Sequence, residues 1–172
     1  MNEATSVVPT ARIQGRVRSL HRKPEVGQEH GLPKPTVPEI RIRNGGVEGD
    51  FNRYRHEEQH DEPEQAVMLM PVETIHALNL EGWPIREGDI GENITTQGVP
   101  YAEFRVGDRF RIGEAEIQIS KPCTPCTNLE LLPYVGKEKG PRFLKTMLHR
   151  RGWYARVVRE GRVRSGDVIE RL

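Results

Sequence analysis

The sequence predicts a mainly β fold, a barrel or sandwich of mostly antiparallel strands with a few accessory helices. Short segments in which apolar and polar residues alternate recur along the chain, as expected for half-buried strands. Glycines and prolines separate these segments at turn positions. Strand patterns do not alternate with helix patterns, which disfavours a parallel sheet covered by helices.

Strands are predicted, in chain order, at residues 11–20, 67–70, 110–112, 115–119, 154–158 and 168–172. Most of these segments alternate, whereas 67–70 is apolar throughout and is expected to be buried on both faces. Gly113 and Glu114 separate two of the strands and form a two-residue hairpin signal.

Two helices and two loops are predicted between the strands. In residues 71–78 and 141–148, apolar side chains recur at the spacing of a helix that buries one face. Each helix pattern begins with a proline, which the first turn tolerates. Residues 21–37 mix charges, glycines and prolines, and residues 57–64 are acidic without an apolar anchor, so both are expected to be loops.

Length and charge limit the classes of function. The 172 residues are expected to form a single domain over 11–172, preceded by a flexible N-terminus at 1–10. The formal net charge is +1, so no nucleic-acid partner is expected. No apolar run approaches the roughly 20 residues that span a bilayer, and the start lacks a secretory signal pattern. We therefore expect a cytoplasmic protein without a membrane partner, whose cysteines are in a reducing compartment.

Cys123 and Cys126 form a Cys-x-x-Cys motif whose chemistry the residues alone leave open. A zinc site would need two more ligands, and His56 and His60 are the only closely spaced histidines. A dithiol redox pair would need a strand-helix-strand context, which the surrounding pattern lacks. A single soft ligand or a sulfur carrier would suit a thiolate in a loop stiffened by flanking prolines. Both thiols could instead simply pack in the core.

Ordered blocks along the chain resemble the MOSC domain, the module named for the C-terminal part of molybdenum cofactor sulfurases. The blocks are residues 46–50 with 65–67, residues 87–99, residues 106–113 continuing to 122–126, and residues 152–158 with 161 and 166–167. Any one block is ordinary turn chemistry, but their order and spacing are specific. The resemblance extends from residue 11 to the C-terminus and implies a MOSC-type β-barrel of the small stand-alone bacterial type.

The resemblance also implies a site for the molybdenum cofactor, a molybdopterin. Cys126 matches the characteristic cysteine of the family, so it is the expected metal ligand and catalytic residue, and a soft thiolate suits that metal. Cys123 is an additional thiol. The expected cofactor-binding residues are Gly49, Asp50, Arg53, Asn93, Thr95, Thr124, Arg142 and Lys145.

Several of these side chains have the chemistry that an anionic heterocycle needs. Asn93 and Thr95 offer amide and hydroxyl groups to ring donors and acceptors. Arg142 and Lys145 are expected near a helix start, where the helix dipole adds positive potential.

The chain departs from the family in the segment after Asp50. Residues 51–52 stand where many relatives carry a basic residue and a histidine, and Arg53 and His56 follow as possible substitutes. The acidic residues 60–64 replace a His-Gly-Gly sequence of many relatives. Where those relatives have glycines with an exposed backbone, this chain therefore has negatively charged side chains.

By resemblance the chain is expected to reduce small N-hydroxylated molecules to amines. No cysteine-rich iron–sulfur segment and no glycine-rich dinucleotide fingerprint is present, so the electrons are expected from a separate electron-donor protein. Pyridoxal phosphate is not an expected cofactor. Two alternatives are a sulfur-carrier or binding module that uses a Cys126 persulfide, and a divergent MOSC domain without catalysis, which the altered loop before Ala66 favours.

Overall fold

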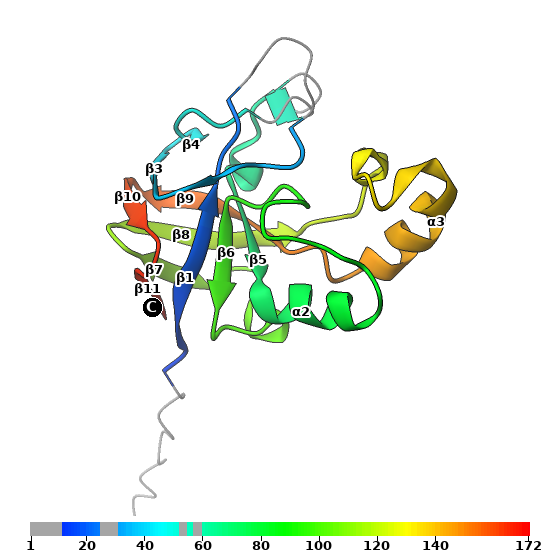
Figure 1. Ribbon diagram of the computed structural model, residues 1–172. Coiled ribbons are helices and arrows are strands. Elements are labelled where there is room, and N and C mark those ends of the chain that lie inside the picture. Colours follow the sequence, from blue (N-terminus) through cyan, green and yellow to red (C-terminus); the bar gives the residue numbers. More distant parts are fainter. Residues whose placement is uncertain (1–11, 25–30, 52–54, 57–59) are drawn as a thin grey trace, which may run out of the picture.

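A closed β-barrel dominates the part of the chain that the structure describes (Figure 1). The computed structural model describes residues 12–24, 31–51, 55–56 and 60–172, and the predicted flexible N-terminus at 1–10 lies outside them. The barrel strands are β1 (Gln14–His21), β5 (Val67–Pro71), β6 (Ile94–Gln97), β7 (Arg109–Ile112), β8 (Ala115–Pro122), β9 (Trp153–Arg159) and β11 (Val168–Arg171). They follow the order β11-β7-β8-β9-β5-β6-β1, and pairing of β1 with β11 closes the ring.

One neighbouring pair in the described barrel, β5 with β6, is parallel, and the other pairs are antiparallel. Parallel neighbours need a crossover connection, and helix α2 (Val72–Leu80) forms part of it. In the view of Figure 1, α2 lies to the right of the lower ends of these two strands. The mainly antiparallel barrel with few helices confirms the predicted fold class.

Strand β5 is buried on both faces because it separates two hydrophobic clusters. Val67 and Leu69 lie in the barrel core, whereas Met68 and Met70 lie in a second cluster between the barrel and the helices. The two-sided burial explains why this segment does not alternate. By contrast, β7 buries every second side chain, as its alternating sequence predicts.

Helix α3 (Gly136–Met147) begins earlier than the predicted start at Pro141. The proline lies inside the helix, where it removes one backbone hydrogen bond. Burial of Gly140, Phe143 and Met147 along one side of α3 offsets that cost, because these residues pack into the second cluster or against its edge. As a result, Lys145 lies in the last turn of the helix and not near its start.

A small second sheet was not predicted from the sequence. It has the order β10-β3-β4 and consists of β3 (Glu39–Arg43), β4 (Gly46–Val47) and β10 (Gly161–Arg164). A short strand β2 (Thr36–Val37) pairs with the end of β1, at the end of the predicted loop 21–37. Three 3-10 helices of the described chain are η1 (Pro63–Gln65), η2 (Tyr101–Glu103) and η3 (Thr127–Leu131).

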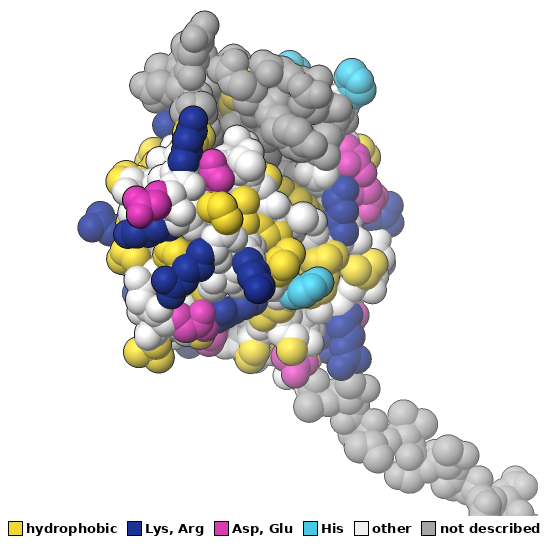
Figure 2. Space-filling model, turned by 90° about the vertical axis from the view of Figure 1, so that its right-hand side faces the viewer, with side chains coloured by type: hydrophobic (Ala, Val, Ile, Leu, Met, Phe, Trp, Pro, Cys, Tyr) yellow, Lys and Arg dark blue, Asp and Glu magenta, His cyan; other side chains and the backbone are white. Residues whose placement is uncertain are grey.

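The outer face that carries α3 shows no concentrated charge. Figure 2 shows lysine and arginine side chains dispersed among hydrophobic ones on this face. Among the residues described, no helix is both long enough and apolar enough to cross a bilayer.

We expect Leu69→Ala to lower the free energy of unfolding by about 2–5 kcal/mol, because the truncation leaves a cavity in the barrel core. Leu80→Ala is the matched control, since Leu80 is 91% exposed at the end of α2 and should change stability by less than about 0.5 kcal/mol. Urea unfolding followed by circular dichroism measures both. Equal losses in the two variants would contradict the assignment of the core.

Candidate functional site

The loop that carries both cysteines leaves the barrel at the end of β8. Cys123 follows the strand directly and is 2% exposed, whereas Cys126 is exposed at the start of η3. The backbone N–H of Cys123 donates to the carbonyl oxygen of Gly152 at 2.9 Å and so ties the loop to the turn before β9. Burial raises the pKa of the Cys123 thiol. The two thiols of the motif therefore differ in their access to solvent.

Arg151, which is not among the site residues expected from the sequence, lies against the exposed thiol. Its Nη1 donates to Cys126 Sγ at 3.1 Å and to the carbonyl oxygen of Thr124 at 2.8 Å. Its Nη2 donates to the carbonyl oxygen of Ile90 at 3.4 Å. Burial disfavours the charge of Arg151, but the adjacent Cys123 and Cys126 outweigh that effect and raise the pKa of the guanidinium.

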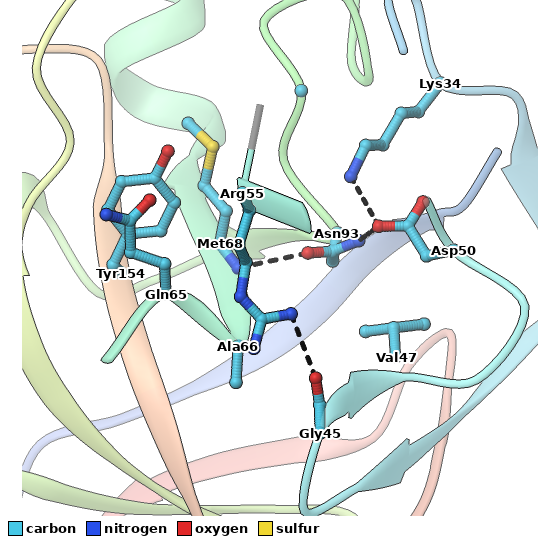
Figure 3. Close-up of a pocket in the computed structure, with 11 residues that line it drawn as sticks. Lys34, Gly45, Val47, Asp50, Arg55, Gln65, Ala66, Met68, Asn93 and Tyr154 are labelled. Atoms are coloured by element: carbon cyan, nitrogen blue, oxygen red, sulfur yellow. Dashed lines mark hydrogen bonds and ion pairs between the residues drawn. The ribbon is translucent and has the colours of Figure 1, made fainter. Parts of the chain in front are cut away.

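A polar pocket lies near the cysteine loop, and Asp50 is one of the residues that line it (Figure 3). Lys34 Nζ donates to Asp50 Oδ2 at 2.6 Å, and Asn93 Nδ2 donates to the same oxygen at 2.9 Å. The other Asp50 oxygen accepts the backbone N–H of Lys23 at 2.8 Å. Asn93 in turn accepts the backbone N–H of Met68 through Oδ1 at 3.1 Å. These contacts join the loop after β4, the segment before β2 and the start of β6.

The pocket and the cysteine loop share a wall. Tyr154 of β9 lines the pocket, and its hydroxyl lies beside the Cys123 thiol. Gly91 also lines the pocket, and the carbonyl oxygen of the preceding residue, Ile90, accepts a hydrogen bond from Arg151. The exposed thiol, the buried guanidinium and the polar pocket therefore belong to one region of the molecule.

Two of the expected cofactor-binding residues, Asp50 and Asn93, line this pocket, and Thr124 meets Arg151 through its carbonyl oxygen. Gly49 is exposed with a φ of 77°, a conformation that favours glycine. Arg142 lies on α3 with its guanidinium 5.5 Å from the centre of the Trp83 ring, and Lys145 is exposed on the same helix.

Arg55 is the buried guanidinium of the altered loop. The predicted Arg53 lies outside the described residues, and His56 is exposed with its Nδ1 2.9 Å from Asp61. Arg55 lines the pocket and donates to the carbonyl oxygens of three residues, Gly45, Asp61 and Glu62. Burial lowers the pKa of this guanidinium. Sequence reasoning missed Arg55 because nothing in the local pattern distinguishes it from its neighbours.

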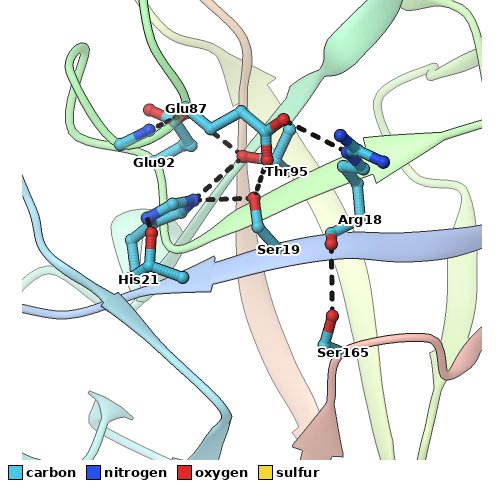
Figure 4. Close-up of polar contacts among 9 residues, drawn as sticks. Arg18, Ser19, His21, Glu87, Glu92, Thr95 and Ser165 are labelled. Carbon is cyan, nitrogen blue, oxygen red and sulfur yellow. Dashed lines mark hydrogen bonds and ion pairs between the residues drawn. The ribbon is translucent and has the colours of Figure 1, made fainter.

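Thr95, another expected cofactor residue, lies in a buried hydrogen-bond network behind the pocket (Figure 4). Its hydroxyl donates to Glu92 Oε1 at 3.2 Å and lies 3.2 Å from His21 Nε2. Ser19 Oγ lies 2.9 Å from the same ring nitrogen and donates to Glu87. The hydroxyls of Ser19 and Thr95 both donate to carboxylates. Their oxygens can therefore only accept from His21, which requires the hydrogen to be on Nε2 of the ring.

This network supports the pocket through the backbone of β1. The His21 carbonyl oxygen accepts Asn93 Nδ2 at 3.3 Å, and the His21 N–H donates to the Asn93 carbonyl oxygen at 2.8 Å. Burial lowers the pKa of the His21 ring and raises the pKa of the Glu92 carboxyl to about 6. Thr95 therefore acts on the pocket indirectly, by way of β1 and Asn93.

The structure offers no preformed site for zinc within the residues it describes. No group of three or more histidine, cysteine, aspartate or glutamate side chains is close enough there to hold a metal ion. His56 and Cys126 do not belong to any such group among these residues. A metal at Cys126 would therefore need ligands from outside the described protein atoms.

Comparison with known proteins adds independent information. The sequence model of the MOSC domain matches residues 56–170. YflK of Bacillus subtilis, described as uncharacterized, is 33% identical over 119 residues, which are 66% of this chain and 50% of YflK. A protein of Gibberella moniliformis described as a reductase is 26% identical over 172 residues, 81% of this chain and 30% of that protein. YiiM of Escherichia coli is 32% identical over 97 residues, 53% of this chain and 42% of YiiM. The chain thus spans half or less of the length of these relatives.

Solved structures show the same fold. YuaD of Bacillus subtilis superposes with a TM-score of 0.77 at 19% identity, covering 92% of this chain and 96% of YuaD. YiiM of Geobacillus stearothermophilus superposes with a TM-score of 0.69 at 23% identity, covering 92% of this chain and 75% of YiiM. At these identities the likeness supports the architecture alone.

We expect Asp50→Ala to lower the free energy of unfolding by about 3–5 kcal/mol, because it leaves Lys34 buried without its counter-charge. Glu48→Ala is the matched control. It removes an exposed pair with Arg43 and should cost less than about 1 kcal/mol. Chemical denaturation at neutral pH measures both, and similar losses would show that the buried pair has no special weight.

We expect Glu92 and His21 to contribute to the pH dependence of stability with opposite signs. The folded state holds the Glu92 proton more tightly than the unfolded state, so this contribution is full below pH 4.5 and is lost as the pH rises through about 6. The folded state resists protonation of His21, which therefore costs stability as the pH falls below 6.5.

Relative to wild type, Glu92→Gln should gain on the order of 2 kcal/mol as the pH rises from 4.5 to above 6. His21→Gln should gain stability in the opposite direction, as the pH falls. Urea unfolding across this range measures the two differences. Slopes of the same sign in both variants would exclude this account of the network.

Proposed function

The chain belongs to the MOSC domain family, and from that premise we propose that it binds the molybdenum cofactor through Cys126 and reduces N-hydroxylated compounds to amines. The observation that carries the proposal is the solvent-exposed Cys126 thiol with the buried Arg151 at 3.1 Å, beside a polar pocket. An accessible thiolate is a suitable ligand for a soft metal. A relative from Gibberella moniliformis described as a reductase, of which this chain matches 30%, supports a reductive reaction in general.

The residues of the region fit an anionic pterin cofactor in their donor chemistry. The described lining of the pocket holds two cationic side chains, Lys34 and Arg55, against one carboxylate, Asp50. Because Asp50 pairs with Lys34 and Arg55 donates to three backbone carbonyl oxygens, a phosphate group would share these donors with the protein. Asn93 offers an amide to a flat heterocycle. In the described part of the chain, Arg151 Nε is buried without a hydrogen-bond partner, so an acceptor on a bound group would satisfy it.

The bound cofactor would supply a metal that exchanges two electrons with the substrate. The overall reaction takes R–NHOH with two electrons and two protons to R–NH2 and water. In this proposal Cys126 would hold the metal, and Arg151, whose Nη1 donates to the Cys126 sulfur at 3.1 Å, fixes the direction of that sulfur. Tyr154 remains protonated because burial raises its pKa, so its hydroxyl is a hydrogen-bond donor at the shared wall. A separate protein supplies the electrons.

We expect protein made in a host that synthesises the cofactor to contain molybdenum and pterin, and Cys126→Ser to lose most of both, because a hydroxyl is a poor soft-metal ligand. Cys123→Ser is the matched control, since Cys123 is 2% exposed and faces the interior. Elemental analysis for molybdenum and fluorescence of the oxidised pterin measure the content.

The same samples distinguish the other functions. A reducible mass gain on Cys126 without molybdenum would indicate a sulfur carrier. Wild-type protein that stays without metal, pterin and persulfide would contradict both functions and leave a MOSC domain without this chemistry. Equal metal content in wild type and Cys126→Ser would exclude Cys126 as the ligand.

A further inference from the structure

We propose that the exposed side of helix α3 is the surface on which the electron donor of this site docks, and that the donor is a small acidic electron-carrier protein. This inference rests on the proposed function, which requires electrons from a separate protein. It adds where that protein binds and which charge it carries.

The exposed side of α3 carries an excess of positive charge. Burial of Phe143 and Met147 turns one side of the helix toward the second hydrophobic cluster, so the other side faces solvent. The basic residues of this helix are all exposed, and one exposed carboxylate, Glu138, accompanies them: Lys137, Lys139, Arg142 and Lys145. The three lysines form no hydrogen bond or ion pair with another residue of the described chain. Their charge is therefore available to a partner.

Exposed leucines lie at the edges of the same surface. Leu131, the last residue of η3, is 44% exposed, and Leu148, directly after α3, is 49% exposed. Figure 2 shows hydrophobic side chains interspersed with lysine and arginine side chains on this face. Apolar contacts surrounded by charged ones are the usual composition of a protein-binding surface. Electron-transfer complexes are weak and bury less than about 1,200 Å² in total, so a contact of that kind does not need a dense charged patch.

The surface of α3 is continuous with the candidate site. Cys126 is the residue at which η3 begins, and the chain passes from η3 through Val135 into α3. The two helices are also packed together, because a side chain at Gly140 of α3 would collide with Glu130 of η3. A protein docked on α3 and η3 therefore lies beside the exposed thiol. Electron transfer slows as donor and acceptor move apart, so this nearness favours the surface over more distant faces.

The sign of the charge identifies the kind of partner. The formal net charge of the whole chain is only +1, so attraction of an anionic protein is a local property of this face. Exposed charges act over about 8 Å at physiological ionic strength, and they raise the rate of association with a partner of opposite charge. An acidic carrier is steered to α3, whereas a basic carrier is repelled.

The test is a titration of isotope-labelled, cofactor-free protein with a plant-type two-iron ferredoxin, an acidic electron carrier, followed by nuclear magnetic resonance at low ionic strength. We expect the shifted or broadened amide signals to lie within residues 126–148. Salt at about 0.5 M should abolish the effect, because exposed charges are then screened. Cytochrome c, a basic carrier of similar size, should leave these signals unchanged.

Charge reversal tests the surface directly. Lys139→Glu combined with Lys145→Glu should weaken binding of the ferredoxin about tenfold or more, because like charges then face each other at the contact. Glutamate is a good helix former, so α3 is retained. Arg16→Glu combined with Arg41→Glu is the matched control, since it reverses two exposed charges on β1 and β3, away from α3 (Figure 1). The control should leave the affinity within about twofold of wild type.

Three results would overturn the proposal on the side of the partner. These are the absence of any signal change at low ionic strength, changes that lie mainly outside residues 126–148, and equal losses of affinity in the two double variants. Two further results would assign the surface to another occupant and so overturn it as well. Concentration-dependent shifts of the same amides without ferredoxin would indicate a second copy of this chain, and binding of phosphatidylglycerol vesicles through the same lysines without binding of ferredoxin would indicate a membrane.

Failure of this inference can be distinguished from failure of the proposed function, because binding is measured without the cofactor. Protein that contains molybdenum and pterin but does not bind ferredoxin at α3 would keep the function and lose the docking surface. Protein that binds ferredoxin at α3 but stays without metal and pterin would keep the surface and lose the function.

Discussion

The register between β8 and β9 is the constraint on which the candidate site depends. It sets Pro122 opposite Trp153, so the cysteine loop leaves one strand at the level where the turn containing Arg151 enters the next. The contact of Cys123 N–H with Gly152 and the reach of Arg151 to Cys126 both follow from this alignment. A shift of one residue would turn each side chain to the opposite face of the sheet.

Burial of charge is the second organising feature. Arg151 and the pair of Lys34 with Asp50 are almost withdrawn from water, and each is compensated by specific partners: a sulfur and carbonyls for the arginine, and a carboxylate for the lysine. Buried charges of this kind are costly to hold and are not needed for a barrel to fold. Arg151 contacts the exposed thiol, and the pair of Lys34 with Asp50 lines the neighbouring pocket, which is the arrangement from which the proposed function is argued.

The cysteine motif changes its meaning once the two environments are known. In the sequence the two cysteines of the motif cannot be told apart, so zinc, dithiol and single-thiolate chemistry all remain open. In the fold, Cys123 is buried with a raised pKa, whereas Cys126 is exposed and faces a guanidinium. The difference in exposure between the two cysteines supports a site that uses one thiol, that of Cys126. The hydrogen-bond network behind the pocket shows the same dependence on the fold, since Thr95 contacts His21, whose backbone bonds to Asn93 of the pocket lining.

The mainly β class, the hairpin across Gly113, the buried strand β5 and the family could all be predicted from the amino-acid sequence, because they depend on local alternation, turn residues and ordered motifs. The sequence did not locate the start of α3, because burial of one helix face outweighed the local cost of Pro141. It also could not select Arg151 or Arg55 from 26 lysines and arginines. Which cation meets which partner depends on strands that are distant in the chain and adjacent in space, so these contacts can be identified in the folded molecule and not in the sequence.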